Sequence, residues 1–335
     1  MNGDFGLWNI SDRAKDLHDS ALVWDNHVCM PQRVDERDMD YLEGLLSSGI
    51  NTVHINIGDA EISLEDQIRM AALYRYWISL HPDKYILAKS AKDIRAAKKA
   101  GKTSILFDVE GMYALDDQLS LIKLYYDLGV RWMLIAYNLG NKVGGGCHDK
   151  EDQGITKFGY QILDEMARVG MIVDCSHTGY RTAMDVLNHS PNPVNFSHSN
   201  PRALIDHPRN IPDELIMACA KTGGVIGING LGHFLGGANA ENMLKHIDYC
   251  VQMVGADHVG IGTDHEFDSG SGFSVESDDN DHIWPPEHYP EIMPTVPLTV
   301  FPELTEGMIR MGYPETAIRG ILGENWLRVA EKVWK

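Results

Sequence analysis

The chain of 335 residues carries 48 acidic against 29 basic side chains, a net charge of −19 with histidine neutral. Because no basic stripe is present to neutralise phosphates, this balance excludes nucleic acid and an anionic membrane as expected partners. The five cysteines are scattered without a CxxC pair. That pattern argues against a disulfide framework and favours a reducing compartment.

The two termini bear on the expected location. Residues 1–19 are polar and lack the apolar core of a signal peptide, and no run of about 18 apolar residues occurs in the chain. Residues 325–335 predict an amphipathic helix and not a cleavable hydrophobic anchor. We therefore expect a cytoplasmic protein without a membrane span.

Short apolar, β-branched runs alternate with longer helical patterns along the chain. The predicted strands cover residues 21–27, 51–58, 103–111, 130–138, 171–177, 193–199, 223–230 and 258–265. The most regular predicted helices cover residues 64–80, 158–170, 212–224 and 240–255. Eight strands with helical crossovers predict one α/β domain over residues 1–335, a (β/α)₈ TIM barrel. An open doubly wound sheet is the rival, weakened because no GxGxxG motif follows the first strand.

Two connections differ from the rest. Residues 266–300 follow the eighth strand and are rich in Asp, Ser, Gly and Pro, so we predict a long loop over the mouth of the barrel. Residues 144–149 (GGGCHD) predict a tight turn near the same rim. A role as a metal ligand is the second, weaker interpretation of this stretch.

Polar residues with metal-binding side chains stand at the ends of five predicted strands. In chain order they are His27 and Cys29, Glu110, His177, His198 and Asp264. The ends of parallel barrel strands meet at one rim, where the catalytic residues of this fold lie. Imidazole, thiolate and carboxylate groups are ligands of Zn²⁺ and similar ions. One histidine at a strand end is usually an ordinary polar residue, but this many at separate strand ends predict a metal site at the C-terminal face.

The motifs around these residues resemble the membrane (renal) dipeptidase family of zinc peptidases. They are DxH at 25–27, VEG at 109–111, DCSH at 174–177, FSHS at 196–199, HPRN at 207–210, VGIGTD at 259–264 and GENWLRV at 323–329. The resemblance runs in order from about residue 20 to the C-terminus. Its most specific pieces are the FSHS…HPRNIPDE stretch and the paired strand-end histidines.

The resemblance implies a metal centre. That family is a (β/α)₈ barrel with two zinc ions bridged by one glutamate. By resemblance, Glu110 would be the bridge, His177 and His198 would hold one ion, and His27 would help to hold the other. The family's first strand carries HxD, whose aspartate completes the first metal site, whereas this chain has Cys29 there.

Cys29 admits three interpretations. A thiolate is a good Zn²⁺ ligand at about 2.3 Å and would keep the first site filled with a softer donor. Alternatively, Cys29 is a small apolar filler, and only the ion held by His177 and His198 binds firmly. Redox sensing is the third and least supported interpretation. Ligation is favoured because Cys29 replaces a ligand at ligand spacing, so we expect two zinc ions, or one if this site is weak.

The resemblance also implies groups that bind the substrate. Arg209 would match the arginine that receives the substrate's carboxylate, and Asp264 would bind the amine or carry a proton to the leaving nitrogen. The family's fourth strand has a histidine before asparagine, thought to polarise the scissile carbonyl, where this chain has Tyr137. A neutral phenol can donate a hydrogen bond to a developing oxyanion but cannot act as a cation. Alternatively, Tyr137 only packs at the barrel mouth.

These residues favour a metal-dependent hydrolase of the dipeptidase type, in which metal-activated water attacks a peptide or related small amide. Glu110 would help to hold that water. The alternatives are a non-catalytic metal-binding or sensor protein on the same barrel, and an amidohydrolase with another small substrate. The expected partner is a small molecule, and a homodimer is left open.

Overall fold

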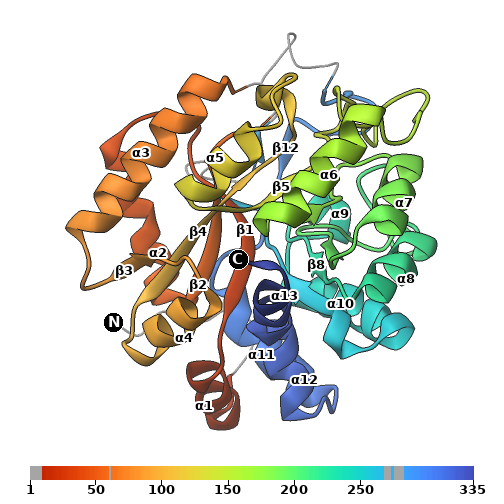
Figure 1. Cartoon of the computed structure of the whole chain (residues 1–335). Coiled ribbons are helices and arrows are strands. Elements are labelled where there is room, and N and C mark those ends of the chain that lie inside the picture. Colours follow the sequence, from red (N-terminus) through yellow and green to blue (C-terminus); the bar gives the residue numbers. More distant parts are fainter. Residues whose placement is uncertain (1–9, 60–61, 268–272, 275–282) are drawn as a thin grey trace.

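The computed structural model describes residues 10–59, 62–267, 273–274 and 283–335 of the chain. Within these ranges, mostly parallel strands curl into a barrel and helices surround them (Figure 1). The barrel strands are β1 (Trp24–Cys29), β2 (Thr52–Asn56), β4 (Thr103–Val109), β5 (Val130–Leu134), β6 (Ile172–Asp174), β7 (Val194–Asn195), β8 (Ile226–Ile228) and β9 (Val259–Ile261).

The sheet follows the chain and returns to its first strand. Strands β1, β2, β4, β5, β6 and β7 pair in that order. A parallel bridge between Phe196 and Ile226 leads from β7 to β8, which pairs with β9. The chain then runs into β10 (His265–Glu266), which pairs in parallel with β1. This arrangement confirms the predicted TIM-barrel fold and its eight strands.

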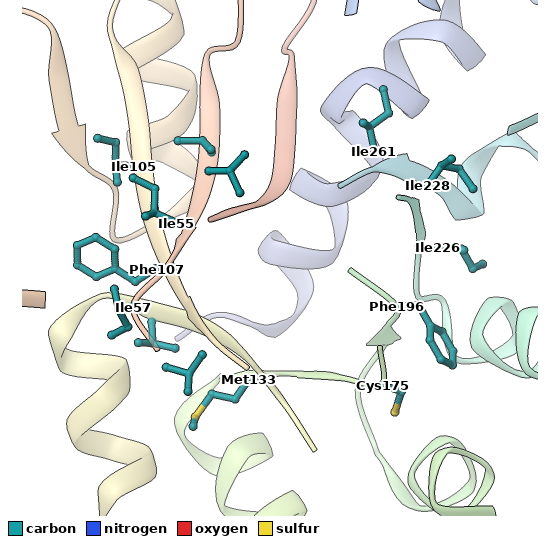
Figure 2. Packing of buried hydrophobic residues seen from close by; sticks show 14 of the residues in the cluster. Ile55, Ile57, Ile105, Phe107, Met133, Cys175, Phe196, Ile226, Ile228 and Ile261 are labelled. Atoms are coloured by element: carbon teal, nitrogen blue, oxygen red, sulfur yellow. The ribbon is translucent and has the colours of Figure 1, made fainter. Parts of the chain in front are cut away.

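Alternation along each strand separates two apolar layers, as β4 illustrates. Ile105 and Phe107 belong to the large cluster between the strands and the surrounding helices, part of which Figure 2 shows. Leu106 belongs instead to the smaller cluster with Trp24 and Trp132. Because successive side chains of a strand point to opposite faces, Leu106 shares the barrel interior with the polar residues that follow it at every second position.

Helices cover the outside of the barrel (Figure 1). The α-helices are α1 (Asp12–Ser20), α2 (Glu43–Ser47), α3 (Leu64–Leu80), α4 (Ala91–Lys99), α5 (Leu121–Leu128), α6 (Lys157–Val169), α7 (Tyr180–His189), α8 (Asp213–Thr222), α9 (Gly232–Leu235), α10 (Ala240–Val254), α11 (Val300–Arg310), α12 (Glu315–Arg319) and α13 (Asn325–Val333). Short 3₁₀ turns are η1 (Glu36–Leu42), η2 (Tyr113–Leu115) and η3 (Ala256–His258), and a π turn, η4 (Gly320–Glu324), links α12 to α13.

The predicted helices agree with the structure to within a few residues, and α3 has the predicted bounds. Two of them, α6 and α8, end at Gly170 and Gly223 with φ of 88°, a left-handed conformation that glycine adopts without steric cost. The sequence did not reveal β3 (Tyr85–Leu87), which pairs in parallel with the start of β4.

The predicted loop 266–300 is described in part, since residues 268–272 and 275–282 lie outside the described ranges. A short antiparallel pair joins β11 (Phe273–Ser274) to β12 (Ile292–Met293). Beyond it, the backbone N–H of Gly232 donates to Pro294 O at 2.7 Å and that of Val296 donates to Gly230 O at 3.0 Å. The described part of the loop therefore packs on the segment that follows β8, at the C-terminal end of the barrel.

Candidate metal centre

The strand ends bring the five predicted ligands and Asp264 into one cluster. His27 and Cys29 belong to β1, and the other four follow the ends of β4, β6, β7 and β9 directly or after a short turn. Glu110 lies at the middle of the cluster. Its Oε1 is 3.1 Å from Nε2 of His198 and 3.5 Å from Nε2 of both His27 and His177. All four of these side chains are buried.

Cys29 and Asp264 extend the cluster on the His27 side. The Cys29 sulfur lies 3.5 Å from His27 Nε2 and 3.8 Å from Asp264 Oδ1, and Asp264 Oδ1 is itself 3.5 Å from His27 Nε2. The ligand atoms of His27, Cys29 and Asp264 therefore lie close enough to share one ion, as do those of His27, Glu110 and His198. On the opposite side, Nε2 of His177 is 3.0 Å from Nε2 of His198.

The backbone at this rim is strained. Asn138, His177 and Asp264 have φ angles of 56°, 60° and 56°. A left-handed conformation costs a non-glycine residue roughly 1–2 kcal/mol. Such residues persist where the surrounding structure holds them, and they concentrate at functional sites. Three of them, after β5, β6 and β9, support a functional site.

Neighbouring side chains fix which imidazole nitrogens face the centre. Nδ1 of His27 is 3.2 Å from Oδ2 of Asp108, and Nδ1 of His177 is 2.7 Å from Oδ1 of Asn138. Because an amide oxygen and an ionised carboxylate both accept, Nδ1 of His177 donates to Asn138 and Nδ1 of His27 donates to the carboxylate form of Asp108. In the neutral ring of His177, Nε2 then presents a lone pair toward Glu110, and Nε2 of His27 would do the same once a cation displaces its proton, which is the arrangement of metal-binding histidines.

The electrostatics differ between the two sides of Glu110, one formed by His177 and His198 and the other by His27. Burial, reinforced by the guanidinium of Arg209, lowers the pKa of His177 well below its usual value. Burial and then the charge of His27 lower the pKa of His198 to about 4. Burial also opposes protonation of His27, but the carboxylates of Glu110 and Asp108 raise its pKa well above the usual value. One side is therefore a pair of neutral imidazoles, and the other is a negative environment that attracts a cation.

This donor set fits a zinc centre. Glu110 Oε1 is buried and has no hydrogen-bond partner among the described residues, although three imidazole nitrogens surround it. Burial raises the pKa of Glu110, but the neighbouring histidines lower it further, to about 2, so the carboxylate is ionised. Imidazole nitrogens that converge on a buried carboxylate can bind a cation together with it, and imidazole with carboxylate is a usual ligand combination for zinc.

Arg209 lies beside the cluster as a buried cation. Its side chain is 2% exposed, and its Nη2 donates to the carbonyl of His198 at 3.3 Å. Its Nε and Nη1 atoms are buried without a hydrogen-bond partner in the described part of the chain. A buried guanidinium with two unused donors is suited to a carboxylate ligand, to which it can donate a charge-assisted hydrogen bond.

Tyr137 is also at the centre. Its buried ring stacks on His177 with ring centroids 4.4 Å apart and meets the edge of Trp284 at 5.7 Å. Burial, and next the charge of Glu110, raise the pKa of its hydroxyl well above the usual value. The phenol therefore stays neutral and keeps its proton as a hydrogen-bond donor.

Three residues that orient the cluster were not predicted from the sequence. They are Asp108 behind His27, Asn138 behind His177, and Asn229, whose Nδ2 donates to Asp264 Oδ2 at 2.8 Å. Asp108 was detectable, because it stands two residues before Glu110 on one strand and so shares its face. Asn138 and Asn229 gave no signal beyond their places near strand ends.

A TIM barrel with a buried histidine–carboxylate centre at the C-terminal ends of its strands is typical of metal-dependent hydrolases. The family described as "Membrane dipeptidase (Peptidase family M19)" matches residues 12–283. The chain therefore belongs to the membrane dipeptidase family, as its motifs predicted. That family is zinc-dependent, and its match confirms a hydrolase of the metallopeptidase type; the number of ions stays a prediction.

Individual relatives agree with this assignment. An uncharacterized dipeptidase of Schizosaccharomyces pombe is 33% identical over 185 residues, which are 52% of this chain and 44% of the relative, so the match spans less than half of that protein. An amidohydrolase structure from Pseudomonas aeruginosa is 29% identical, with a TM-score of 0.85 over 96% of this chain and 99% of the other.

A metallopeptidase structure from Rhodobacter sphaeroides, liganded with a phosphinate mimic of L-Ala-D-Ala, shares the fold. Its TM-score is 0.78 and its identity 21%, over 94% of this chain and 99% of that one.

Among the described residues, none of the helices has the length and apolar character needed to cross a bilayer. The cytoplasmic location and the homodimer stay predictions.

Proposed function

We propose that the chain is a zinc-dependent hydrolase that cleaves a dipeptide or a closely related small amide. The observation that carries the proposal is the convergence of three imidazole Nε2 atoms on the ionised Glu110 carboxylate, with the unpaired donors of Arg209 beside them. The first feature suits a metal centre, and the second suits a substrate that ends in a carboxylate.

The ligands would divide about Glu110, which would bridge two ions. His177 and His198 would hold one ion, and His27 with Cys29 would hold the other. Bound zinc would lower the pKa of a water molecule and polarise the scissile carbonyl. The 3.5 Å between the Cys29 sulfur and His27 Nε2 supports the thiolate interpretation, because two donors of one ion lie at such a separation.

The other side chains would bind and orient the substrate. Arg209 would hold the terminal carboxylate. Burial raises the pKa of Asp264, but His198 and His27 lower it well below the usual range, so its carboxylate is charged. It can receive the substrate's ammonium, or take a proton from the attacking water and pass it to the leaving nitrogen. Tyr137 would donate its hydroxyl proton in a hydrogen bond to the carbonyl oxygen as negative charge develops there.

Metal analysis combined with a substrate panel tests this function. The panel compares free dipeptides with dipeptide amides, which lack the terminal carboxylate, and with N-acetyl dipeptides, which lack the amine. We expect about two zinc ions per chain and hydrolysis of the free dipeptides above both blocked sets. Zinc-loaded protein that cleaves none of them would contradict the proposal.

Arg209→Met sharpens the assignment of the carboxylate site. Since it removes a charge-assisted pair, the preference for free dipeptides over dipeptide amides should fall by about tenfold or more. Arg69→Met is the matched control, because Arg69 is exposed on α3 and pairs with Glu65 along the helix. An unchanged preference in the Arg209 variant would place the carboxylate elsewhere.

A second substrate class follows from two observations. The amidohydrolase structure is the more similar in sequence of the structures compared above, and Tyr137 stands where the dipeptidase pattern has histidine. N-acyl amino acids and cyclic amides therefore belong in the panel. Higher kcat/KM for one of them than for any dipeptide would replace the dipeptide substrate and keep the metal chemistry. The non-catalytic alternative is not favoured, because the matched family and the similar structures are hydrolases.

A further inference from the structure

Asn138, which follows β5, contacts both the metal centre and the loop that covers it. The residue is fully buried and has a left-handed backbone with φ of 56°. Its Oδ1 is 2.7 Å from Nδ1 of His177 and 3.6 Å from the sulfur of Cys147. Its Nδ2 donates to the carbonyl of Ile283 at 3.1 Å.

These contacts allow one orientation of the amide. The carbonyl of Ile283 can only accept, so the NH₂ group of Asn138 faces it and Oδ1 faces His177. Oδ1 in turn requires that Nδ1 of His177 donates. The proton of the neutral ring is thereby held on Nδ1, and Nε2 is left as a lone pair directed to Glu110 at 3.5 Å.

We name residues 283–289 the strap, and its other end is fastened as well. The carbonyl of His288 accepts from Nε2 of His207 at 3.0 Å and from Nε2 of His233 at 2.8 Å. The hydroxyl of Tyr289 is 2.6 Å from Nε2 of His148. The strap therefore crosses from the segment after β5 to the segments after β7 and β8.

The strap also contacts the proposed catalytic groups. The ring of Trp284 meets those of Tyr137 and His177 edge to face, with centroids 5.7 and 6.5 Å apart. Nδ1 of His207, which holds the strap through its other nitrogen, accepts the backbone N–H of Arg209 at 3.1 Å. Through Asn138 and His207, the strap is joined to the side chain of a metal ligand and to the backbone of the carboxylate-binding residue.

We propose that Asn138 is a positioning residue with two separable tasks: its oxygen fixes the tautomer and orientation of His177, and its nitrogen seats the strap over the centre. The inference rests on the proposed function for its importance to catalysis. Both tasks, however, are measurable without turnover, so a failed substrate panel would not decide it.

A simpler explanation is that the left-handed backbone alone selects asparagine, since Asn, Asp and Gly tolerate that conformation best. Two substitutions that respect the backbone separate the explanations. Asn138→Asp keeps an oxygen for His177 but places a second oxygen against the carbonyl of Ile283. Asn138→Gly removes both contacts without backbone strain.

The experiment measures zinc affinity by chelator competition and strap protection by hydrogen exchange of the peptide that covers 283–289. His177→Ala identifies which step of the zinc titration belongs to that imidazole. Asn138→Gly should weaken this step by about 10–100-fold, the usual effect of losing an outer partner of a ligand. Asn138→Asp should keep it within a few fold of the parent protein, and both variants should exchange faster in the strap.

Circular dichroism and thermal melting establish that both variants are folded. If Asn138→Gly loses zinc affinity and Asn138→Asp does not, the result supports the role of the side-chain oxygen. If the strap exchanges faster in both variants, the result supports the role of the side-chain nitrogen. Parent-like zinc binding in Asn138→Gly, or parent-like exchange of the strap in both variants, would overturn the proposal and leave the backbone explanation.

Discussion

The two sides of the Glu110 carboxylate are built from different chemistry. His177 and His198 form a side of two neutral imidazoles, whose Nε2 atoms are 3.0 Å apart. His27 stands on the other side among the carboxylates of Asp108 and Asp264 and the sulfur of Cys29. The first side keeps the pattern of the membrane dipeptidases, and the second replaces its aspartate by cysteine.

The comparison shows how one shared carboxylate can serve unlike sites. On a side made of neutral nitrogens, the imidazoles supply lone pairs and Glu110 supplies the negative charge that attracts a cation. A side that already carries carboxylates, and can add a thiolate, attracts a cation more strongly and prefers a softer one. Identity and affinity of the ion can therefore differ across a few ångströms without a change of fold.

The largest effect is expected from the residue that both sides share. Glu110→Gln replaces a bridging anion by a neutral amide, so zinc content on both sides should fall together and hydrolysis should drop by more than about a hundredfold, beyond the range for outer partners. Glu315→Gln, on the exposed face of α12, is the control. A Glu110 variant with two metals and a near-parent rate would show that no common bridge exists.

The next effect should distinguish the two histidines of the neutral side. His177→Ala should release one ion and leave the other, with the melting temperature little changed because the barrel core does not include this ring. His198→Ala should weaken both ions, because the His198 ring also stacks on His27 with centroids 4.3 Å apart and shares Glu110 with it. Zinc analysis of the two variants checks this, and global unfolding of either would indicate a structural role.

Cys29 tests the other side. Cys29→Ala should empty that site and spare the ion of His177 and His198, since only one donor set loses a member. Cys29→Asp should keep the site filled and move its preference from Zn²⁺ or Cd²⁺ toward Mn²⁺ or Co²⁺, because a harder oxygen replaces sulfur. Metal competition monitored by elemental analysis measures both. An unchanged metal count in the Ala variant would make Cys29 a packing residue.

The smallest effects should come from the outer partners, and they should be unequal. Asp108→Asn removes a charged acceptor from His27 and should lower zinc affinity on that side by about 10–100-fold. Ser197→Ala removes a neutral hydroxyl that lies 2.7 Å from Nδ1 of His198, so its effect should be several-fold smaller. Chelator competition compares the two variants. Equal losses would mean that the charge of Asp108 does not distinguish the sides.

The fold could be predicted from the sequence because the barrel strands are local and strongly patterned. Each is a short apolar run followed by a helix, and in β4 every residue is buried. The strand β3 was not predicted. It has three residues, and the side chains after its first position are only partly buried. A strand that short carries too little alternation to be told from a loop.

The candidate site was predicted in the same way, from residue types at strand ends. Parallel strands of a barrel must deliver their carboxyl ends to one rim, so His27, Glu110, His177 and His198 could be grouped without coordinates. Cys29 and Asp264 belonged to the same predicted group, but the sequence could not show that both lie beside the same His27 nitrogen, because that depends on the register between β10 and β1.

The sequence by itself thus determined the class of this protein: an acidic TIM barrel with imidazole, thiol and carboxylate groups at its strand ends. Only the tertiary structure decided which nitrogen of each histidine faces Glu110 and that two donors of Arg209 remain unpaired. It alone placed Asn138 between His177 and the strap. The physical reason is that strand patterning is set by side chains close together in the chain. Tautomers, pKa shifts and unpaired buried donors depend instead on neighbours brought together from distant segments, as Asn138 and Ile283 are.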